Sequence, residues 1–184
     1  MKKRTTPTPI ENKNTPPGSS HLSPASLGVT LKTTIERGDP YMAPEIYNVE
    51  IAVLEIVRGK EAEKRVKAQG ISENPPNAGF EYILTRIKLR YFPRTRGLGE
   101  EPYILTEGQF VAVSADGKQE YKIPPVQQQP QPQLIDRLFQ PRDSHEGWIL
   151  VQVSADEKKP LLVFKREHVA SVFGMRKHVW FQLY

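Results

Sequence analysis

The chain contains no cysteine, and this absence removes several classes of protein at once. Disulfide bonds, thiolate metal centres and cysteine nucleophiles are all excluded. No run approaches the 20 or so apolar residues of a membrane-spanning helix, so no transmembrane segment is predicted. The chain starts with the charged segment Met1-Lys-Lys-Arg4, but threonine and proline follow instead of an apolar stretch, so no signal peptide is predicted.

The chain also lacks a large excess of charge of either sign. It has 26 basic and 21 acidic residues among 184, which gives a net charge of +5. This balance favours anionic surfaces, but the basic residues are spread along the chain and rarely alternate with aromatic residues that could stack on bases. Nucleic acid is therefore not the expected partner. An apolar content of 38% supports one domain with a sizeable core.

Histidine is scarce, and its spacing does not favour a metal site. The four histidines are His21, His145, His168 and His178. They lie in separate segments, without the His-x-His or His-x-x-x-His spacing that would favour zinc. Asp136, Asp143 and Glu146 gather around His145, and two interpretations stay open: a cation site, or a turn whose charges keep it in solvent. No metal and no cofactor is expected.

The residue spacings of common catalytic sites are missing as well. The segment Arg96-Gly-Leu-Gly99 lacks the strand-to-helix context of a phosphate-binding loop. Ser114 and Ser154 follow strand patterns and stand close to aspartates, but no histidine is spaced to activate either hydroxyl. We therefore predict a protein without enzymatic activity. A hydrolase with an unrecognised site stays as an alternative.

Proline, by contrast, is abundant in the first 28 residues, together with threonine, serine and asparagine. Proline has no backbone N–H for helix or sheet hydrogen bonds, so residues 1–28 are predicted to be a disordered tether and residues 29–184 a single domain. The tether is similar to the spacer that follows the lipid-bearing cysteine of bacterial surface lipoproteins. A disordered N-terminus of a cytoplasmic protein is the alternative.

Strand patterns dominate the rest of the chain. Residues 47–53 alternate apolar and polar side chains and change phase at Leu54, which predicts a β-bulge or a strand buried on both faces. The only helix-favouring segment is 60–69, with Ala62 and Val66 on one side and Gly70 placed to end it. Strands are expected at residues 31–35, 47–56, 80–92, 110–113, 119–123, 147–153, 160–164 and 178–183. About eight strands without long helices predict an all-β, immunoglobulin-like antiparallel β-sandwich.

Turn signals connect these strands. The pattern Val-x-Val-Ser-Ala-Asp-x-Lys occurs twice, at 111–118 and 151–158, and we interpret both copies as separate strand ends where serine and aspartate favour turns. Asp116-Gly117 in the first copy is a strong hairpin signal. Residues 124–146 form a long excursion rich in proline and glutamine, which the apolar patch at 134–139 is expected to pin to the domain.

The candidate binding residues come from the longest strand pattern, residues 80–92. Ile83, Ile87, Leu89 and Tyr91 share one face, whereas Arg86, Lys88 and Arg90 share the other. This basic row is either a solvated sheet face or an anion-binding surface. Trp148 is a further candidate, because a tryptophan at this place either packs into the core or contributes to binding, and the same holds for Trp180.

Several of these motifs together resemble the DUF4352 group of bacterial immunoglobulin-like domains. They are Arg58-Gly-Lys-Glu-Ala62, Pro76-x-x-Gly-Phe-Glu-Tyr82, Asp116-Gly117, Gly147-Trp148 and the segments 160–164 and 179–183. The resemblance covers roughly residues 30–184. It implies an immunoglobulin-like sandwich on secreted proteins and lipoproteins, often behind a low-complexity tether, and it carries no catalytic residues. The chain departs from the group in showing no signal peptide and no lipobox cysteine, so a lipid anchor is not accounted for.

These observations lead to one expected function and its alternatives. We expect a non-enzymatic extracytoplasmic domain, on the cell surface or secreted, that binds a protein or cell-envelope component. The binding residues would be Arg86, Lys88, Arg90 and Trp148. A structural spacer or an oligomerisation module without its own ligand is the alternative function, and a cytoplasmic location is the alternative setting.

Overall fold

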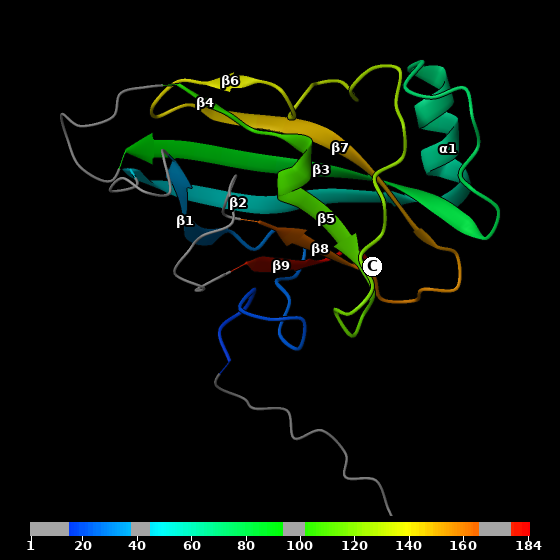
Figure 1. Ribbon diagram of the computed structural model, residues 1–184, viewed down its shortest axis with the longest axis horizontal. Helices are drawn as coiled ribbons and strands as arrows, with labels where there is room; N and C mark the ends of the chain where they lie inside the picture. The colour runs from blue at the N-terminus through cyan, green and yellow to red at the C-terminus, as the bar shows by residue number, and fades with distance from the viewer. Residues whose placement is uncertain (1–14, 38–44, 94–101, 166–177) are drawn as a thin grey trace, which may run out of the picture.

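The computed structural model describes residues 15–37, 45–93, 102–165 and 178–184 (Figure 1). Strands dominate these residues, with one α-helix and one short 3-10 helix at Glu107–Gln109. In chain order, the other elements are β1 Leu31–Arg37, β2 Glu45–Arg58, α1 Gly59–Ala68, β3 Phe80–Pro93, β4 Tyr103–Ile104, β5 Phe110–Val113, β6 Leu138–Phe139, β7 Ser144–Ser154, β8 Leu161–Phe164 and β9 Val179–Gln182.

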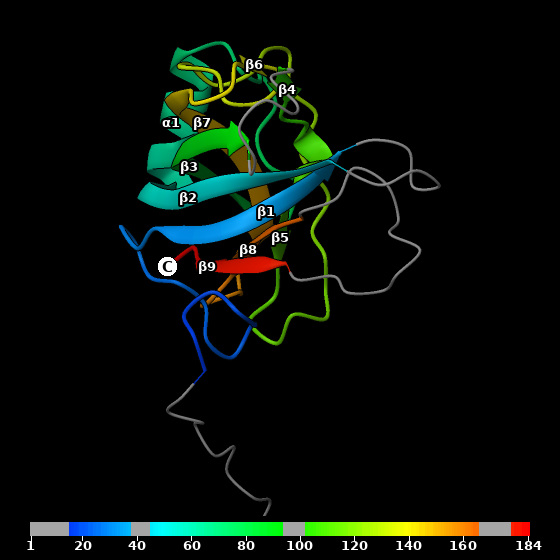
Figure 2. The same cartoon turned by 90° about the vertical axis from the view of Figure 1, so that its left-hand side faces the viewer.

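Two antiparallel sheets form the body of the protein. The four-stranded sheet has the order β1-β2-β3-β7 and the three-stranded sheet the order β5-β8-β9, while β4 and β6 pair separately. The two sheets lie one above the other in Figure 2. The predicted antiparallel β-sandwich is confirmed. Constant-type immunoglobulin sandwiches also divide four to three, but there the third strand belongs to the three-stranded sheet, whereas β3 lies between β2 and β7 here.

The core fills the space between the sheets and follows from side-chain alternation. Ile83, Ile87 and Leu89 of β3 are fully buried. They share one apolar cluster with Phe164 of β8 and Phe181 of β9. Because alternate residues of a strand point to opposite faces, the same alternation directs the charged residues of β3 away from this core.

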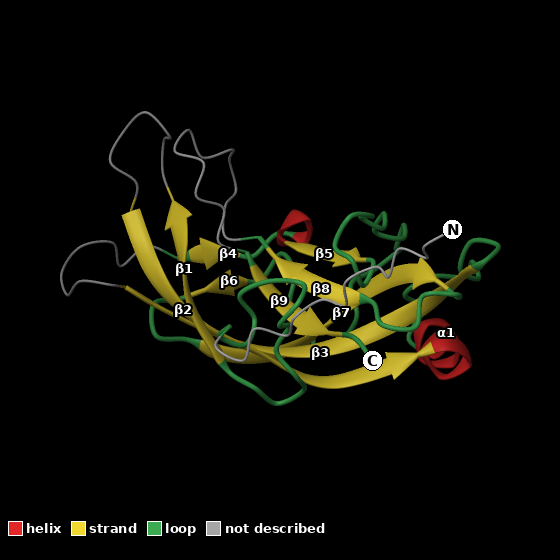
Figure 3. Ribbon diagram, turned by 90° about the horizontal axis from the view of Figure 1, so that it is seen from below, coloured by secondary structure: helices red, strands yellow, loops and turns green. Residues whose placement is uncertain are grey.

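The β2 phase change and the predicted helix are both confirmed. The register between β2 and β3 shifts between Val53 and Glu55, as a β-bulge requires. Helix α1 lies at one end of the long strands β2 and β3 (Figure 3). Its buried residues Ala62 and Val66 pack on the outer side of the four-stranded sheet, against Leu84 and other apolar side chains.

One predicted strand is wrong. Residues 119–123 do not form a named strand, although the turn before them forms as expected. What remains is a bridge between Val113 and Glu120, with the bonds from Ser114 N–H to the Gln119 carbonyl and from Tyr121 N–H to the Ala112 carbonyl. Pro124 and Pro125 follow at once, and proline cannot donate to a sheet ladder, so the pairing ends there. The two-residue strands β4 and β6 were not predicted, because so short a segment shows no alternation.

The 124–146 excursion is pinned as predicted. Leu134, Ile135 and Phe139 are buried in the core. The excursion also covers the edge of β7, where Trp148 N–H donates to the Pro132 carbonyl at 2.9 Å. Gly147 permits this approach, because a Cβ there would lie 2.8 Å from the Pro132 oxygen.

The segment just before β1 packs against β9. Ala25 N–H donates to the Trp180 carbonyl at 2.8 Å, and Gln182 N–H donates to the Ala25 carbonyl at 2.9 Å. Ala25 is 1% exposed and belongs to the core. The packed domain therefore includes residues before the expected boundary at residue 28. Residues 1–14 of the expected tether lie outside the described residues.

Candidate functional site

The four predicted binding residues lie on one surface, the outer side of the four-stranded sheet. In the strand register, Arg86 pairs with Trp148, Lys88 lies between Ala52 and Glu146, and Arg90 lies between Glu50 and Ser144. Helix α1 covers one end of this surface. We call the part that α1 leaves uncovered the charged face; its main residues are Lys32, Glu50, Glu55, Arg86, Lys88, Arg90, Arg142 and Glu146.

Carboxylates from neighbouring strands pair with two of the three cations of the basic row, Arg86 and Lys88. Arg86 contacts Glu146 at 2.6 Å and Glu55 at 4.0 Å, and Lys88 contacts Glu146 at 3.4 Å. Burial alone would raise the pKa of Glu146, but its hydrogen bonds to Lys88 and Arg86 outweigh that effect and lower the pKa. Arg65 of α1 also binds Glu55, at 3.2 Å. At this end, positive and negative side chains alternate in a continuous network, as expected for cross-strand pairs that stabilise a sheet.

Trp148 is a packing residue at the junction between α1 and this network. It is partly buried and packs on the apolar cluster beneath α1. The guanidinium carbon of Arg65 lies 5.9 Å from its ring centre, within cation–π range. Hydrogen bonds to Glu61 and Glu55 raise the pKa of Arg65 above its ordinary value. A cation of the same chain thus already lies near the Trp148 ring.

The other end of the charged face keeps an excess of positive charge. Glu50 is shared by Lys32 and Arg90, each at 3.6 Å. Arg90 also lies over the Phe92 ring, at 5.5 Å from its centre. Among the described residues, Arg142 forms no ion pair with a carboxylate. One carboxylate therefore faces three cations at this end, whereas the two charges match at the α1 end.

A hollow of about 440 Å³ opens at this positive end. Its lining residues are Thr30, Glu50, Ala52, Lys88, Arg90, Arg142 and Ser144; we call it the basic hollow. The hollow exists because Ala52 of β2 carries only a methyl group. Its neighbours on the same face have long side chains: Lys88 lies opposite it on β3, and Glu50 lies two residues before it on β2. Two arginines, one lysine and two hydroxyls can all donate hydrogen bonds into this space.

Sequence reasoning identified Lys88 and Arg90 but missed the other residues of the hollow. Thr30, Ala52 and Arg142 come from three segments that are far apart in the chain, and only the strand register brings them together. One local signal was available. Ala52 is a small residue at a polar position of an alternating strand, between Glu50 and the phase change at Leu54, and such a gap leaves space on a sheet face.

The serines of the two repeated motifs are engaged in their turns. The Ser114 hydroxyl donates to Asp116 at 2.6 Å, and this bond is the main reason why the pKa of Asp116 is lowered. The Ser154 hydroxyl accepts from the Asp156 N–H at 3.4 Å. The two turns lie side by side, since Ala115 N–H donates to the Glu157 carboxylate at 3.3 Å.

The acidic residues around His145 do not converge on one point. His145 Nε2 lies 2.9 Å from the Gln133 carbonyl, Asp143 accepts from the Gln140 N–H at 2.8 Å, and Glu146 joins the charged face. Asp136 lies near Glu107 instead. Within the described ranges, no three histidine, aspartate or glutamate side chains are grouped to hold a metal ion. His168 lies outside these ranges.

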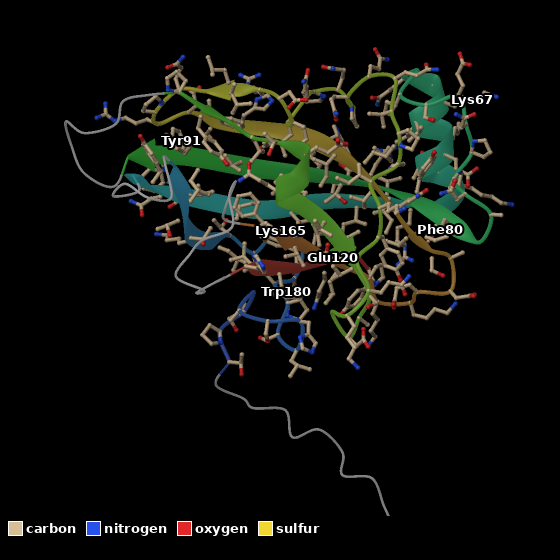
Figure 4. The ribbon with its side chains drawn as sticks, in the orientation of Figure 1. Lys67, Phe80, Tyr91, Glu120, Lys165 and Trp180 are labelled. Atoms are coloured by element: carbon tan, nitrogen blue, oxygen red, sulfur yellow. The ribbon has the colours of Figure 1, made fainter. Side chains whose placement is uncertain are left out.

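Trp180, the second tryptophan, lies on the outer side of the three-stranded sheet. It packs on Val111, Val113, Leu161 and Val163, and its ring centre is 5.9 Å from that of His21. Trp180 is therefore largely engaged in packing. Figure 4 also labels Glu120 and Lys165, whose charged atoms are 3.2 Å apart.

Residues outside the strands cover three sheet edges. The Gly18 carbonyl and Ala25 bond to β9, Gln119 and Tyr121 bond next to β5, and Pro132 bonds to β7. At these positions the edge strands already have partners within the chain, which limits their pairing with a strand of another chain. The charged face is thus a more accessible surface for a partner than these edges.

Across the residues that the structure describes, no helix is long and apolar enough to span a membrane. No protein-family model matches the chain, and no curated protein or solved structure matches it either.

Proposed function

We propose that the protein is a non-enzymatic, extracytoplasmic binding domain that recognises an acidic protein or cell-envelope component through its charged face. The observation that carries this proposal is the unequal charge along the face, with three cations around Glu50 at the end away from α1. A rigid sheet holds these side chains, and complementary charge steers a partner to such a surface. The resemblance to DUF4352 domains supports the setting outside the cytoplasm.

A structural module without a ligand is the second candidate. The alternating network of Arg65, Glu55, Arg86, Glu146 and Lys88 favours it, because cross-strand ion pairs account for these charges without any partner. The two functions differ in what they predict for binding: the first requires binding that depends on the basic row, and the second requires none.

The test is retention of the purified protein on cell envelopes isolated from the native host. Reversing the three charges would set new acids against Glu50, Glu55 and Glu146, so the informative variant is the neutral triple Arg86→Gln, Lys88→Gln and Arg90→Gln. The matched control replaces Lys118, Lys122 and Lys158, three exposed lysines outside the four-stranded sheet, with glutamine.

We expect the wild type and the control to sediment with the envelopes, and the neutral triple to lose at least about tenfold in affinity, since each charge-assisted hydrogen bond contributes about 1.5–3 kcal/mol. Circular dichroism verifies that the triple is folded. If the folded triple binds as the wild type does, the charged face is not the binding surface and the proposal is wrong. If the wild type itself does not bind, the proposal is also wrong and the structural module without a ligand is favoured.

The location is tested separately, by fractionating native cells and analysing the mature N-terminus by mass spectrometry. A processed or lipidated end in the envelope or secreted fraction supports the proposal. An unprocessed Met1 in the cytosol contradicts it.

A further inference from the structure

The basic hollow differs from the rest of the charged face in how its cations are compensated. Towards α1, Arg65 and Arg86 each contact two carboxylates at 4.0 Å or less. At the hollow, Lys88 is bound to Glu146 on its far side, and Arg90 shares Glu50 with Lys32. Arg142 adds a charge with no acidic partner among the described residues. The basic hollow is therefore a concave site whose lining carries more positive than negative charge.

The turn before β7 holds Arg142 over the hollow. The Arg142 N–H donates to the Tyr91 carbonyl at 2.7 Å, and the Tyr91 N–H donates to the Asp143 carbonyl at 3.0 Å. Arg142 has a φ of 75°, a left-handed conformation that is uncommon for residues other than glycine and asparagine. Such conformations persist where the surrounding structure imposes them, and they concentrate at ligand sites.

We infer that the basic hollow binds a phosphate ester of a polyhydroxyl compound, such as a sugar or glycerol phosphate; this deepens the proposed function and rests on it. The forked guanidinium groups of Arg90 and Arg142 match two oxygens of a phosphate, and Lys88 supplies a third positive charge. The volume of about 440 Å³ lies in the range of small-molecule sites.

Glu50 explains why the ligand should carry hydroxyl groups. Its carboxylate forms part of the hollow's wall, where it would repel a bare anion but can accept hydrogen bonds from ligand hydroxyls. The hydroxyls of Thr30 and Ser144 can donate or accept. A ligand with a phosphate at the Arg142 side and hydroxyls towards Glu50 satisfies both kinds of lining residue. Inorganic phosphate satisfies only one.

Two substitutions test the site without disturbing the ion-pair network. Arg142→Asn removes the unbalanced charge, and asparagine accepts a left-handed backbone better than most residues. Ala52→Leu fills the hollow and leaves every charge in place. The matched control is Lys158→Gln, an exposed lysine in the turn between β7 and β8. Thermal unfolding verifies that all variants are folded, and if Ala52→Leu is not, Arg142→Asn still tests the site.

The measurement is isothermal titration calorimetry of the full chain with glycerol 3-phosphate, inorganic phosphate and glycerol. We expect glycerol 3-phosphate to bind more tightly than inorganic phosphate, and glycerol not to bind. Both Arg142→Asn and Ala52→Leu should weaken glycerol 3-phosphate binding at least about tenfold, from the loss of a charge-assisted contact of about 1.5–3 kcal/mol or of the space itself. The control should bind as the wild type does. No binding at millimolar ligand, or binding that neither variant changes, would overturn the inference.

Sedimentation with vesicles distinguishes a lipid headgroup from a free ligand. Vesicles of phosphatidylglycerol in phosphatidylcholine present glycerol phosphate on a surface. Sedimentation that Ala52→Leu abolishes supports the inference with the lipid as source, and titration without sedimentation supports it with a soluble source. Sedimentation that is insensitive to Ala52→Leu contradicts it. If glycerol 3-phosphate does not bind, or neither variant weakens its binding, while the neutral glutamine triple still loses envelope binding, the inference fails and the proposed function stands.

Discussion

Thr85 places a hydroxyl in the sandwich core without a hydrogen-bond partner. The residue is fully buried, on the same face of β3 as Ile83 and Ile87, and its Oγ1 has no partner among the described residues. A buried polar atom that loses its bonds to water without replacement destabilises the folded state by about 1–3 kcal/mol. The apolar neighbours suit a methyl group at this position better than a hydroxyl.

We therefore expect Thr85→Val to raise the free energy of unfolding by about 1 kcal/mol, measured by urea denaturation. Thr85→Ala is the control: it removes the hydroxyl but leaves a void, so its effect should be less favourable than that of Thr85→Val. A Thr85→Val protein that is less stable than the wild type would show that the hydroxyl is bonded.

Glu107 gives a second prediction, on pH dependence. Burial of its carboxyl, followed by the charge of Asp136, raises its pKa above the ordinary value of 4.5. A raised carboxyl pKa means that the folded state holds the proton more tightly than the unfolded state, so the ionised group destabilises the fold at higher pH. Because the side chain is largely exposed, solvent screening keeps the effect below about 1 kcal/mol.

Glu107→Gln should therefore be slightly more stable than the wild type at pH 7. This difference in stability should disappear as the pH falls below the ordinary pKa of the carboxyl. Urea denaturation at pH 7 and at about pH 4 measures this, with Glu73→Gln, at an exposed glutamate outside the sheets, as the control. An advantage that grows towards low pH would show the opposite sign of the pKa shift.

At the scale of elements, Arg58 joins the end of β2 to three other segments. Its guanidinium binds the Glu81 carboxylate at the start of β3 and donates to the Glu157 carbonyl at 3.1 Å and to the Leu183 carbonyl at 3.5 Å. The side chains of Arg58 and Glu81 are 26% and 19% exposed. A half-buried pair of this kind loses more when one partner is removed than when both are, because the remaining charge stays desolvated.

Arg58→Met should lower the free energy of unfolding by about 2 kcal/mol. Glu81→Gln should lower the free energy of unfolding by less in the Arg58→Met protein than in the wild type. A double-mutant cycle in urea measures this coupling. Strictly additive effects would mean that the two side chains act independently.

The elements also show how far the sequence alone predicts structure. Alternation along β3 predicted both which residues enter the core and that Arg86, Lys88 and Arg90 point outward, because both facts depend on a single strand. It could not predict that Glu50 and Glu146 neutralise these cations. Those contacts depend on the register of β2 and β7, and register is set by the whole sheet. The basic hollow is hidden for the same reason.

At the scale of the whole molecule, the limits of the domain differ from those that composition suggests. Proline, serine and threonine in the first 28 residues favour a tether, yet Ala25 is part of the core. Composition is an average over many residues, so it cannot reveal that a single alanine is buried and pairs with a distant strand. The hydrogen bonds between this segment and β9 stabilise its packed conformation.

Ala25→Asp tests this extension of the domain. A charge at a 1% exposed position has no partner in the core, so we expect the free energy of unfolding to fall by at least about 2 kcal/mol. Ser26→Asp is the matched control at the exposed neighbouring position and should change it by less than about 0.5 kcal/mol. Equal, small effects of both changes would place residue 25 outside the packed domain.

The contact between Ala25 and Phe181 is parallel, and it joins a segment near the start of the described chain to the last strand. A force that pulls residue 15 away from Tyr184 would slide these two segments along each other and load their hydrogen bonds together rather than one at a time. The fold is thus suited to resist tension applied between these two ends. Pulling experiments on single molecules should find Ala25→Asp yielding at lower force than Ser26→Asp.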